Sequence, residues 1–190
     1  MLLPIYLYGH PVLRKIAEPL EATDNNEETQ KLIADMWETM YNSDGVGLAA
    51  PQIGKSIQLV VIDGSPMAER FPECADAKMC LINPEITEAD DAELVAFEEG
   101  CLSVPGLSET VKRPDKIHMT WLDENFQPHE ADFSGFLARI IQHECDHLIG
   151  KVYTDRISPI RKQFIKSKLT NIAKGKVACD YRTKAAVNRR

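Results

Sequence analysis

The residues with the clearest chemical potential lie in one short run, Gln142-His143-Glu144-Cys145-Asp146-His147. Its two histidines are four positions apart, so in a helix both imidazoles face the same way and can reach one metal ion. Glu144 would lie beside that site, where it can take a proton from water. The run follows the H-E-x-x-H pattern, which is specific enough to disfavour the alternative of two histidines that meet by chance on an amphipathic helix.

Two histidines need a third protein ligand. Metzincin proteases supply a histidine through H-E-x-x-H-x-x-G-x-x-H, but here Tyr153 takes that last position, although Gly150 is in place. Thermolysin-like proteases use a glutamate further downstream, and this chain has no glutamate after Glu144. The third ligand must therefore come from upstream or from an aspartate.

An upstream stretch, Glu98-Glu99-Gly100-Cys101-Leu102-Ser103, follows a strand-like run and offers a cysteine. A thiolate there could bind a metal, but a lone cysteine is more often a small buried apolar residue. The same interpretation applies to the other four cysteines, which are Cys74, Cys80, Cys145 and Cys179.

A glycine-rich stretch at residues 45–56 reads GVGLAAPQIGKS and raises the question of phosphate binding. A P-loop has the form G-x-x-x-x-G-K-[ST], but Ala49 takes the position of its first glycine. A P-loop also joins a strand to a helix, whereas this stretch follows a helical pattern and leads into a strand-like one. A tight glycine turn without chemistry is the better interpretation of this stretch taken alone.

Three stretches taken together, GVGLAAPQ, EGCLS and HECDH, resemble the signature motifs of the peptide deformylases in the same order. The opening GHPVLRKIA and the late DRISPI resemble that family too, so the resemblance covers nearly the whole chain. It implies a metal-dependent hydrolase that removes the formyl group from the N-terminal formylmethionine of nascent polypeptides and releases formate. It also implies one divalent metal ion, Fe(2+) first, with Zn(2+), Ni(2+) or Co(2+) as alternatives, and a thiolate ligand suits both iron and zinc.

Carried over residue by residue, the resemblance implies that the metal is held by Cys101, His143 and His147. It implies that Glu144 is the general base and then the acid, and that the Gln52 amide and the Leu102 N–H stabilise the developing oxyanion. The residues it places around the substrate are Val46, Gly47, Phe97, Glu99, Gly100, Phe136, Arg139 and Ile140.

Two positions depart from the family's usual pattern. Arg139 adds polarity where many relatives are apolar, and Gly106-Leu107-Ser108 stands where many bacterial members carry an arginine near the peptide backbone. Arg113 is expected to pair with Glu98 or Glu99, or to remain a solvated charge.

The elements that must position these residues follow from periodicity. Apolar residues at helical spacing predict helices over 27–42 and from 159 to about 174. Capping residues predict a further helix from Asp132 or Ser134, as N-cap, to Gly150 as C-cap. In the third helix the apolar residues expected along one side are Ile160, Phe164, Ile165, Leu169 and Ile172. Strand-like runs are 57–62, 79–82, 92–97, 116–122 and 126–131. We expect an α+β fold of mostly antiparallel strands around a central helix that carries H-E-x-D-H, with an N-terminal and a C-terminal helix.

The composition bounds the class of protein. A chain of 190 residues with 27% charged and 44% hydrophobic residues suits one globular domain. We expect a catalytic domain at 1–174 and a basic, flexible tail at 175–190. The start has no basic n-region and is interrupted by proline, so neither a signal peptide nor a transmembrane span is expected. Five irregularly spaced cysteines indicate a reducing cytoplasm.

The net charge of −7 is unevenly distributed. Residues 161–190 carry ten Lys or Arg and one Asp, a balance of +9, which leaves −16 for the rest. A basic C-terminal region would suit docking on the ribosome, where nascent formyl-methionyl peptides emerge, while a solvated helix face is the plain alternative. No membrane or DNA partner is expected.

Two rival functions share the metal-site residues. A metallopeptidase that cuts internal bonds is disfavoured by the missing downstream ligand, and cleavage of unformylated peptides would reveal it. A metal-stabilised binding module without catalysis is disfavoured by Glu144, since a non-ligand carboxylate has no purpose there. Metal-dependent folding without hydrolysis would favour that second rival.

Overall fold

The structure is a computed structural model that describes residues 1–90 and 92–186. Its first long helix, α1 (Glu27–Asn42), forms over the residues that the sequence predicts. The Asn26 side chain caps the first turn by accepting a hydrogen bond from a backbone N–H. The helix packs on strands β2 and β3 through the apolar face that its spacing indicates, which includes Ile33, Met36 and Met40.

Five strands form the main sheet in the spatial order β2-β3-β4-β7-β8, and each pairing is antiparallel. Their bounds are β2 (Gly47–Ala49), β3 (Leu59–Asp63), β4 (Lys78–Ala89), β7 (Lys116–Leu122) and β8 (Pro128–Ser134). β4 extends well beyond the four residues predicted for it. Register shifts after Ile82 and Ile86 bend this strand, so it curves as the sheet wraps around the core.

Two smaller pairings complete the strands. β5 (Leu94–Gly100) and β6 (Ser108–Pro114) form an antiparallel ribbon, and β1 (Ile5–Tyr6) pairs in parallel with β9 (Thr183–Lys184). The predicted mostly antiparallel α+β arrangement is confirmed; in the described residues the parallel pairings are β1–β9 and an isolated bridge between Glu18 and Ile57. Strands β1, β2, β6 and β9 were not predicted, because they are short or rich in polar residues.

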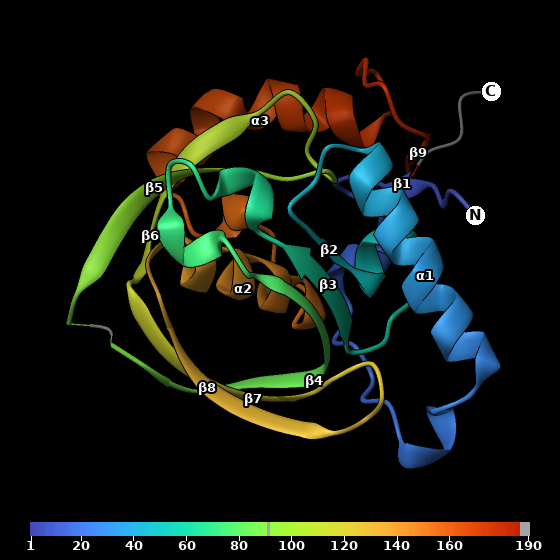
Figure 1. Cartoon of the computed structure of the whole chain (residues 1–190). Helices are drawn as coiled ribbons and strands as arrows, with labels where there is room; N and C mark the ends of the chain where they lie inside the picture. The colour runs from blue at the N-terminus through green and yellow to red at the C-terminus, as the bar shows by residue number, and fades with distance from the viewer. Residues whose placement is uncertain (91, 187–190) are drawn as a thin grey trace.

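Helix α2 (Gly135–Leu148) lies at the centre of the molecule, enclosed by the main sheet on one side and the β5–β6 ribbon on another (Figure 1). Most of its side chains are buried, including both histidines and Glu144. Packing of α2 against β2, β3, β7 and β8 fixes it from several directions. Any side chain on this helix is therefore held in place by the core.

Helix α3 (Pro159–Ala173) lies across the outside of the fold (Figure 1). Ile165, Leu169 and Ile172 bury its inner face, as predicted. The same prediction is wrong for Ile160 and Phe164, which are 72% and 74% exposed. Phe164 precedes the buried Ile165 by one residue, and that step rotates it by about 100° around the helix axis, away from the core.

Short 3₁₀ helices connect these elements: η1 (Pro11–Arg14), η2 (Ala22–Asp24), η3 (Ala50–Ile53), η4 (Ser65–Met67), η5 (Pro72–Cys74) and η6 (Tyr153–Asp155). None of the helices in the described residues is both long and apolar enough to cross a membrane.

The segment predicted as a flexible tail begins after α3. Residues 176–186 return along the body, and β9 within them pairs with β1, so this segment lies beside the N-terminal strand (Figure 1). Backbone hydrogen bonds join Arg182 O to the Ile5 N–H (2.8 Å) and Lys184 O to the Leu7 N–H (2.9 Å). Within the described residues this segment is therefore packed against the body, while residues 187–190 of the predicted tail lie outside them.

Candidate active site

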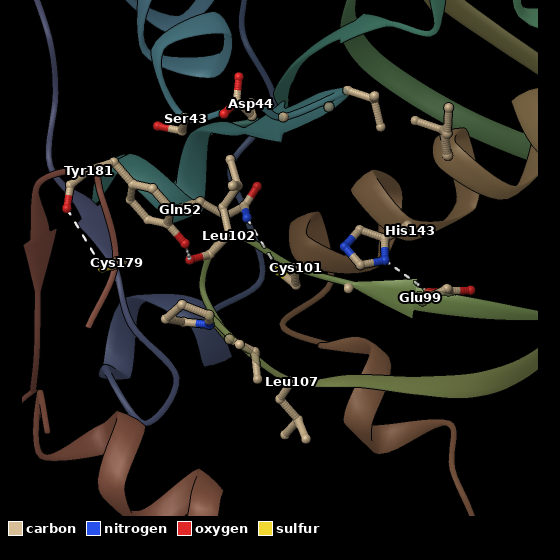
Figure 2. A pocket seen from close by; sticks show the side chains of 18 of the residues that line it. Ser43, Asp44, Gln52, Glu99, Cys101, Leu102, Leu107, His143, Cys179 and Tyr181 are labelled. Carbon is tan, nitrogen blue, oxygen red and sulfur yellow. Dashed lines mark hydrogen bonds and ion pairs between the residues drawn. The ribbon is translucent and has the colours of Figure 1, made fainter. Parts of the chain in front are cut away.

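Three segments that are far apart in the sequence meet beside α2 (Figure 2). The helix itself carries His143, Glu144 and His147. Cys101 follows directly after β5, and Gln52 lies on η3 after β2. The structure thus brings together the three motifs whose order in the sequence suggested a common site.

The side chains of Cys101, His143 and His147 offer ligand atoms that all lie within 4.8 Å of one another. Cys101 Sγ lies 3.4 Å from His147 Nε2. Burial, and then the neighbouring His143, lower the pKa of His147 to about 3, so its imidazole is neutral, which is the form that binds metals. A cysteine and two histidines in this arrangement fit a divalent ion with one coordination position left for a reactant.

The orientation of His143 is set by Glu99, whose Oε2 lies 2.9 Å from His143 Nδ1 and leaves Nε2 to face the cysteine (Figure 2). Arg113 donates to both oxygens of Glu99, from Nε (2.6 Å) and Nη2 (2.8 Å). Burial opposes ionisation of Glu99, but the hydrogen bonds from Arg113 and His143 hold its pKa well below its usual value. An ionised Glu99 therefore fixes the ring and tautomer of His143.

Arg113 also connects this carboxylate to a second one. Its Nη1 donates to Asp146 Oδ2 (2.7 Å), and Arg156 binds the same carboxylate from the other side. The Arg113, Glu99 and Asp146 side chains are buried and the Arg156 side chain is partly exposed, so a largely buried charge network lies behind His143 and His147. Of the three alternatives left open for Arg113, the structure shows the pair with Glu99. The contact with Asp146 was not predicted, although Asp146 lies between the two histidines of the motif.

The carboxyl group of Glu144 is almost fully buried, at 4% exposure. Its Oε2 has no hydrogen-bond partner within the described residues. Burial raises the pKa of Glu144 to about 7. A Cβ atom added to Gly47 would lie 2.5 Å from Glu144 Oε1, so only glycine lets the loop pass this close to the carboxylate. A buried carboxyl group that titrates near neutral pH and has a free oxygen is suited to proton transfer.

The Gln52 side chain is fixed at both ends of its amide. Its Oε1 accepts a hydrogen bond from the Ala49 N–H (2.8 Å), and its Nε2 donates to Ser103 Oγ (3.3 Å) and lies 3.5 Å from Cys101 Sγ. The amide nitrogen therefore points to the cysteine and its neighbours (Figure 2). No hydrogen bond within the described residues uses the Leu102 N–H, which leaves a second donor next to Cys101.

A pocket of about 510 Å³ opens at this site. Its lining includes these residues predicted to surround a substrate: Val46, Gly47, Glu99, Gly100, Phe136, Arg139 and Ile140. Phe97 is the exception, since its ring lies behind the wall and meets the Phe136 ring edge-on, with 5.7 Å between centroids. Phe71, from the loop between β3 and β4, stacks on Phe136 at 4.2 Å, a contact that the sequence did not predict.

Arg139 lines the pocket, yet its guanidinium is committed to the protein. It donates to Glu99 Oε1 (2.8 Å), Val111 O (2.9 Å) and Val95 O, and only 3% of the residue is exposed. The guanidinium of Arg139 therefore joins α2 to the β5–β6 ribbon and is not free to bind a ligand.

The sequence missed a large part of the pocket. Its lining also includes residues 42–44, 104–107 and 178–181, none of which was among the predicted substrate-binding residues. The 178–181 stretch carries no motif and lies about eighty positions from Cys101, so no local pattern could have indicated it.

Comparison with known proteins supports one family. The polypeptide deformylase family profile matches residues 2–163. The peptide deformylase of Salinibacter ruber is 43% identical over 185 residues, which cover 95% of this chain and 93% of that protein.

Solved structures agree with the sequence comparison. A peptide deformylase from Legionella pneumophila superposes with a TM-score of 0.79 at 39% identity, over 93% of this chain and 98% of that one. A class I type b peptide deformylase from Acinetobacter baumannii with Met-Ala-Ser bound gives a TM-score of 0.75 at 35% identity, over 83% and 99% of the two chains. The chain therefore belongs to the peptide deformylase family, metal-dependent hydrolases that remove the formyl group from the N-terminal formylmethionine of nascent polypeptides and release formate.

Proposed function

We propose that Cys101, His143 and His147 hold the catalytic metal and that Glu144 moves the proton of the reaction. The observation that carries this proposal is the convergence of one thiol and two imidazoles within 4.8 Å, next to a buried carboxyl group with an unpartnered oxygen. A bound divalent ion would supply Lewis acidity, polarising the formyl carbonyl and making water more acidic.

Glu144 would accept a proton from the attacking water and return it to the nitrogen of the leaving amine. Its burial supports both steps, because a carboxyl group with a pKa of about 7 takes up and releases a proton at little cost near neutral pH. Asp146, its neighbour on α2, cannot share this role, since its carboxylate is bound by two arginines.

Gln52 and Leu102 would hold the oxygen of the formyl group as negative charge develops on it. The Gln52 amide is already oriented by Ala49 and Ser103, so no side chain must be reorganised during the reaction. Fixed donors of this kind each contribute about 3–4 kcal/mol to transition-state stabilisation.

The methionine side chain would enter the apolar part of the pocket, between Val46, Phe136 and Ile140. Phe97 would act from behind by supporting the Phe136 ring. Gly100 would let the substrate backbone approach closely, because a Cβ atom there would meet nothing within 4 Å. Gly47 would face the substrate with its backbone, since Glu144 fills the space on its Cβ side.

Ferrous iron is the metal we propose, with zinc, nickel or cobalt as alternatives that the same ligands could bind. We also propose a cytoplasmic location, because formylated nascent peptides arise there. We propose a single catalytic domain whose core is residues 1–174, to which the basic segment 175–190 adds the pocket-lining residues 178–181.

Formate release from formyl-Met-Ala-Ser, measured without oxygen in the presence of ferrous iron, tests the function. Glu144→Gln should keep bound metal and lose nearly all turnover, while Cys101→Ala should lose the metal. Cys145→Ala is the matched control, since Cys145 packs against the core next to the motif and should leave metal binding intact. Normal turnover of Glu144→Gln, or metal retention by Cys101→Ala, would refute these assignments.

We further propose that the basic C-terminal region docks on the ribosome. Two of its cations are paired within the protein, Arg161 with Glu109 (2.8 Å) and Lys162 with Asp155 (2.9 Å). The exposed lysines at 166, 168 and 174 are better candidates for phosphate contacts.

Changing these three lysines to glutamine should abolish co-sedimentation with ribosomes at moderate salt and spare the hydrolysis of a free tripeptide. Each lost phosphate contact should lower the log–log salt slope by about 0.7–0.9. The same change at Lys15, Lys55 and Lys112, which are also exposed, is the control. Unchanged co-sedimentation of the first variant would refute the docking role.

A further inference from the structure

The C-terminal segment 176–186, here called the C-terminal strap, forms one wall of the active-site pocket. Residues 178–181 line the pocket and lie across the loop at Cys101 and Leu102 from His143 and Glu99 (Figure 2). The strap is secured beyond the pocket, where β9 pairs with β1. The outer wall of the site is thus built from one end of the chain and anchored to the other.

Tyr181 connects the strap to the site. Its hydroxyl donates a hydrogen bond to Leu102 O at 2.8 Å, and its ring packs in the same apolar cluster as the Leu102 side chain (Figure 2). Burial, and then the nearby thiols of Cys179 and Cys101, raise the pKa of Tyr181, so the hydroxyl remains protonated and can donate at any working pH.

The loop that Tyr181 contacts has few other supports. The Val104 N–H donates to Cys101 O (2.8 Å) within the loop, and the Tyr8 N–H donates to Ser103 O (2.8 Å) from the N-terminal segment. The carbonyl of Leu102 lies between these two bonds and is fixed by Tyr181. The Leu102 N–H shares a peptide plane with the Cys101 carbonyl, which the Val104 N–H holds, and the Leu102 carbonyl lies in the next plane, which Tyr181 holds. Fixing both planes restricts both backbone dihedrals of Leu102, so loss of the Tyr181 bond would let the N–H reorient.

We propose that Tyr181 is a positioning residue for deformylation and that the strap completes the active site. This inference rests on the proposed function, in which the Leu102 N–H donates to the developing oxyanion. Tyr181 would fix the direction of that N–H from the carbonyl side, and strap residues 178–181 would contact the part of the peptide that follows the first residue.

Tyr181→Phe tests the positioning role with the ring retained. We expect kcat and kcat/KM for formyl-Met-Ala-Ser to fall together by about tenfold, because a loosened donor weakens an interaction made in the transition state. Bound metal and KM should stay close to the wild-type values. Tyr41→Phe is the matched control, since Tyr41 also loses one hydroxyl bond to an acceptor (Asp63, 2.7 Å) at a site away from the metal ligands.

If the Tyr181 bond were only structural, the two variants would lose similar stability and both would keep kcat. An unchanged kcat for Tyr181→Phe would therefore overturn the positioning role. If the wild-type protein released no formate from any formyl peptide, the proposed function would fail first, which is a different outcome.

Removal of residues 176–190 tests the wall. The truncated protein should have a lower kcat on both substrates, because it lacks Tyr181. Its KM for formyl-Met-Ala-Ser should rise at least about fivefold. Its KM for formyl-methionine amide should not rise, because this substrate ends before the strap. A synthetic peptide of residues 176–190, added in trans, should restore both constants, whereas the same peptide with phenylalanine at position 181 should restore KM and not kcat. Equal changes of KM for the long and the short substrate would refute the proposal that the strap contacts the peptide beyond its first residue.

Discussion

Replacing Arg113 by methionine probes the charge network behind His143 and His147. Arg113 is fully buried and makes three hydrogen bonds of 2.6–2.8 Å to Glu99 and Asp146. Methionine keeps much of the apolar stem and removes the charge. Glu99 then keeps Arg139 and His143 as partners, and Asp146 keeps Arg156.

The expected loss follows from leaving two buried carboxylates short of one cation. Removing one partner of a buried ion pair costs about 3–5 kcal/mol, and the remaining partners place this case near the lower end, at about 3 kcal/mol. For a chain of 190 residues, that loss lowers the melting temperature by roughly 6–12 °C.

The loss should also depend on pH with a defined sign. Burial opposes ionisation of Glu99 and Asp146, but their hydrogen bonds and ion pairs, those of Arg113 among them, hold both folded-state pKa values below the ordinary ones. The stability that these carboxylates contribute is therefore complete above their unfolded pKa values, near 4, and is lost as pH falls through the lowered folded values. The gap between wild type and Arg113→Met should be full at pH 7 and narrow in acid.

Urea unfolding followed by circular dichroism measures this gap, with the metal chelated in both proteins so that metal binding does not add to stability. Lys112→Met is the control, because it removes the same charge from the preceding residue, whose side chain is exposed. The reasoning would be refuted if Arg113→Met lay within about 1 kcal/mol of Lys112→Met, or if the gap widened in acid.

Three further outcomes are expected. Gly47→Ala should keep its metal but release formate at least about tenfold more slowly, because the new Cβ would lie 2.5 Å from Glu144 Oε1; full turnover would contradict this geometry. Asn83→Ala should lose about 2–3 kcal/mol in urea unfolding, since Asn83 has φ 49° and bonds both the N–H and the carbonyl of Leu20 at 2.8 Å. Asn83→Gly should lose less because glycine tolerates this φ, so equal losses would argue against backbone strain. Burial opposes ionisation of Asp155, but its hydrogen bonds, with that from Arg14 the strongest, lower the pKa of its carboxyl group to about 2. Asp155→Asn should therefore cost about 1 kcal/mol at pH 7, and this cost should shrink as pH falls below the unfolded pKa and disappear as pH falls through the folded one. A cost independent of pH would count against the ion pairs.

The sequence by itself determined the helices and the histidine pair. Helix α1 could be predicted because its apolar residues recur every three or four positions, a pattern that records which face is buried. Helix α2 could be predicted from the capping residues at its two ends. The same local geometry places His143 and His147 on one face of α2. Resemblance to a family then related Cys101 and Gln52 to the same site, a relation that the residues alone left open.

The tertiary structure alone decided which distant polar groups meet. β6 reads Ser-Glu-Thr-Val-Lys-Arg-Pro, and nothing in this run distinguishes its buried Arg113 from an exposed arginine. Only the folded chain brings Glu99 and Asp146 beside it. The pairing of β9 with β1 and the bond from Tyr181 to Leu102 join residues far apart in the chain. Such contacts produce no periodic pattern in the sequence. They depend on how the whole chain folds around α2, not on residues that are close together in the sequence.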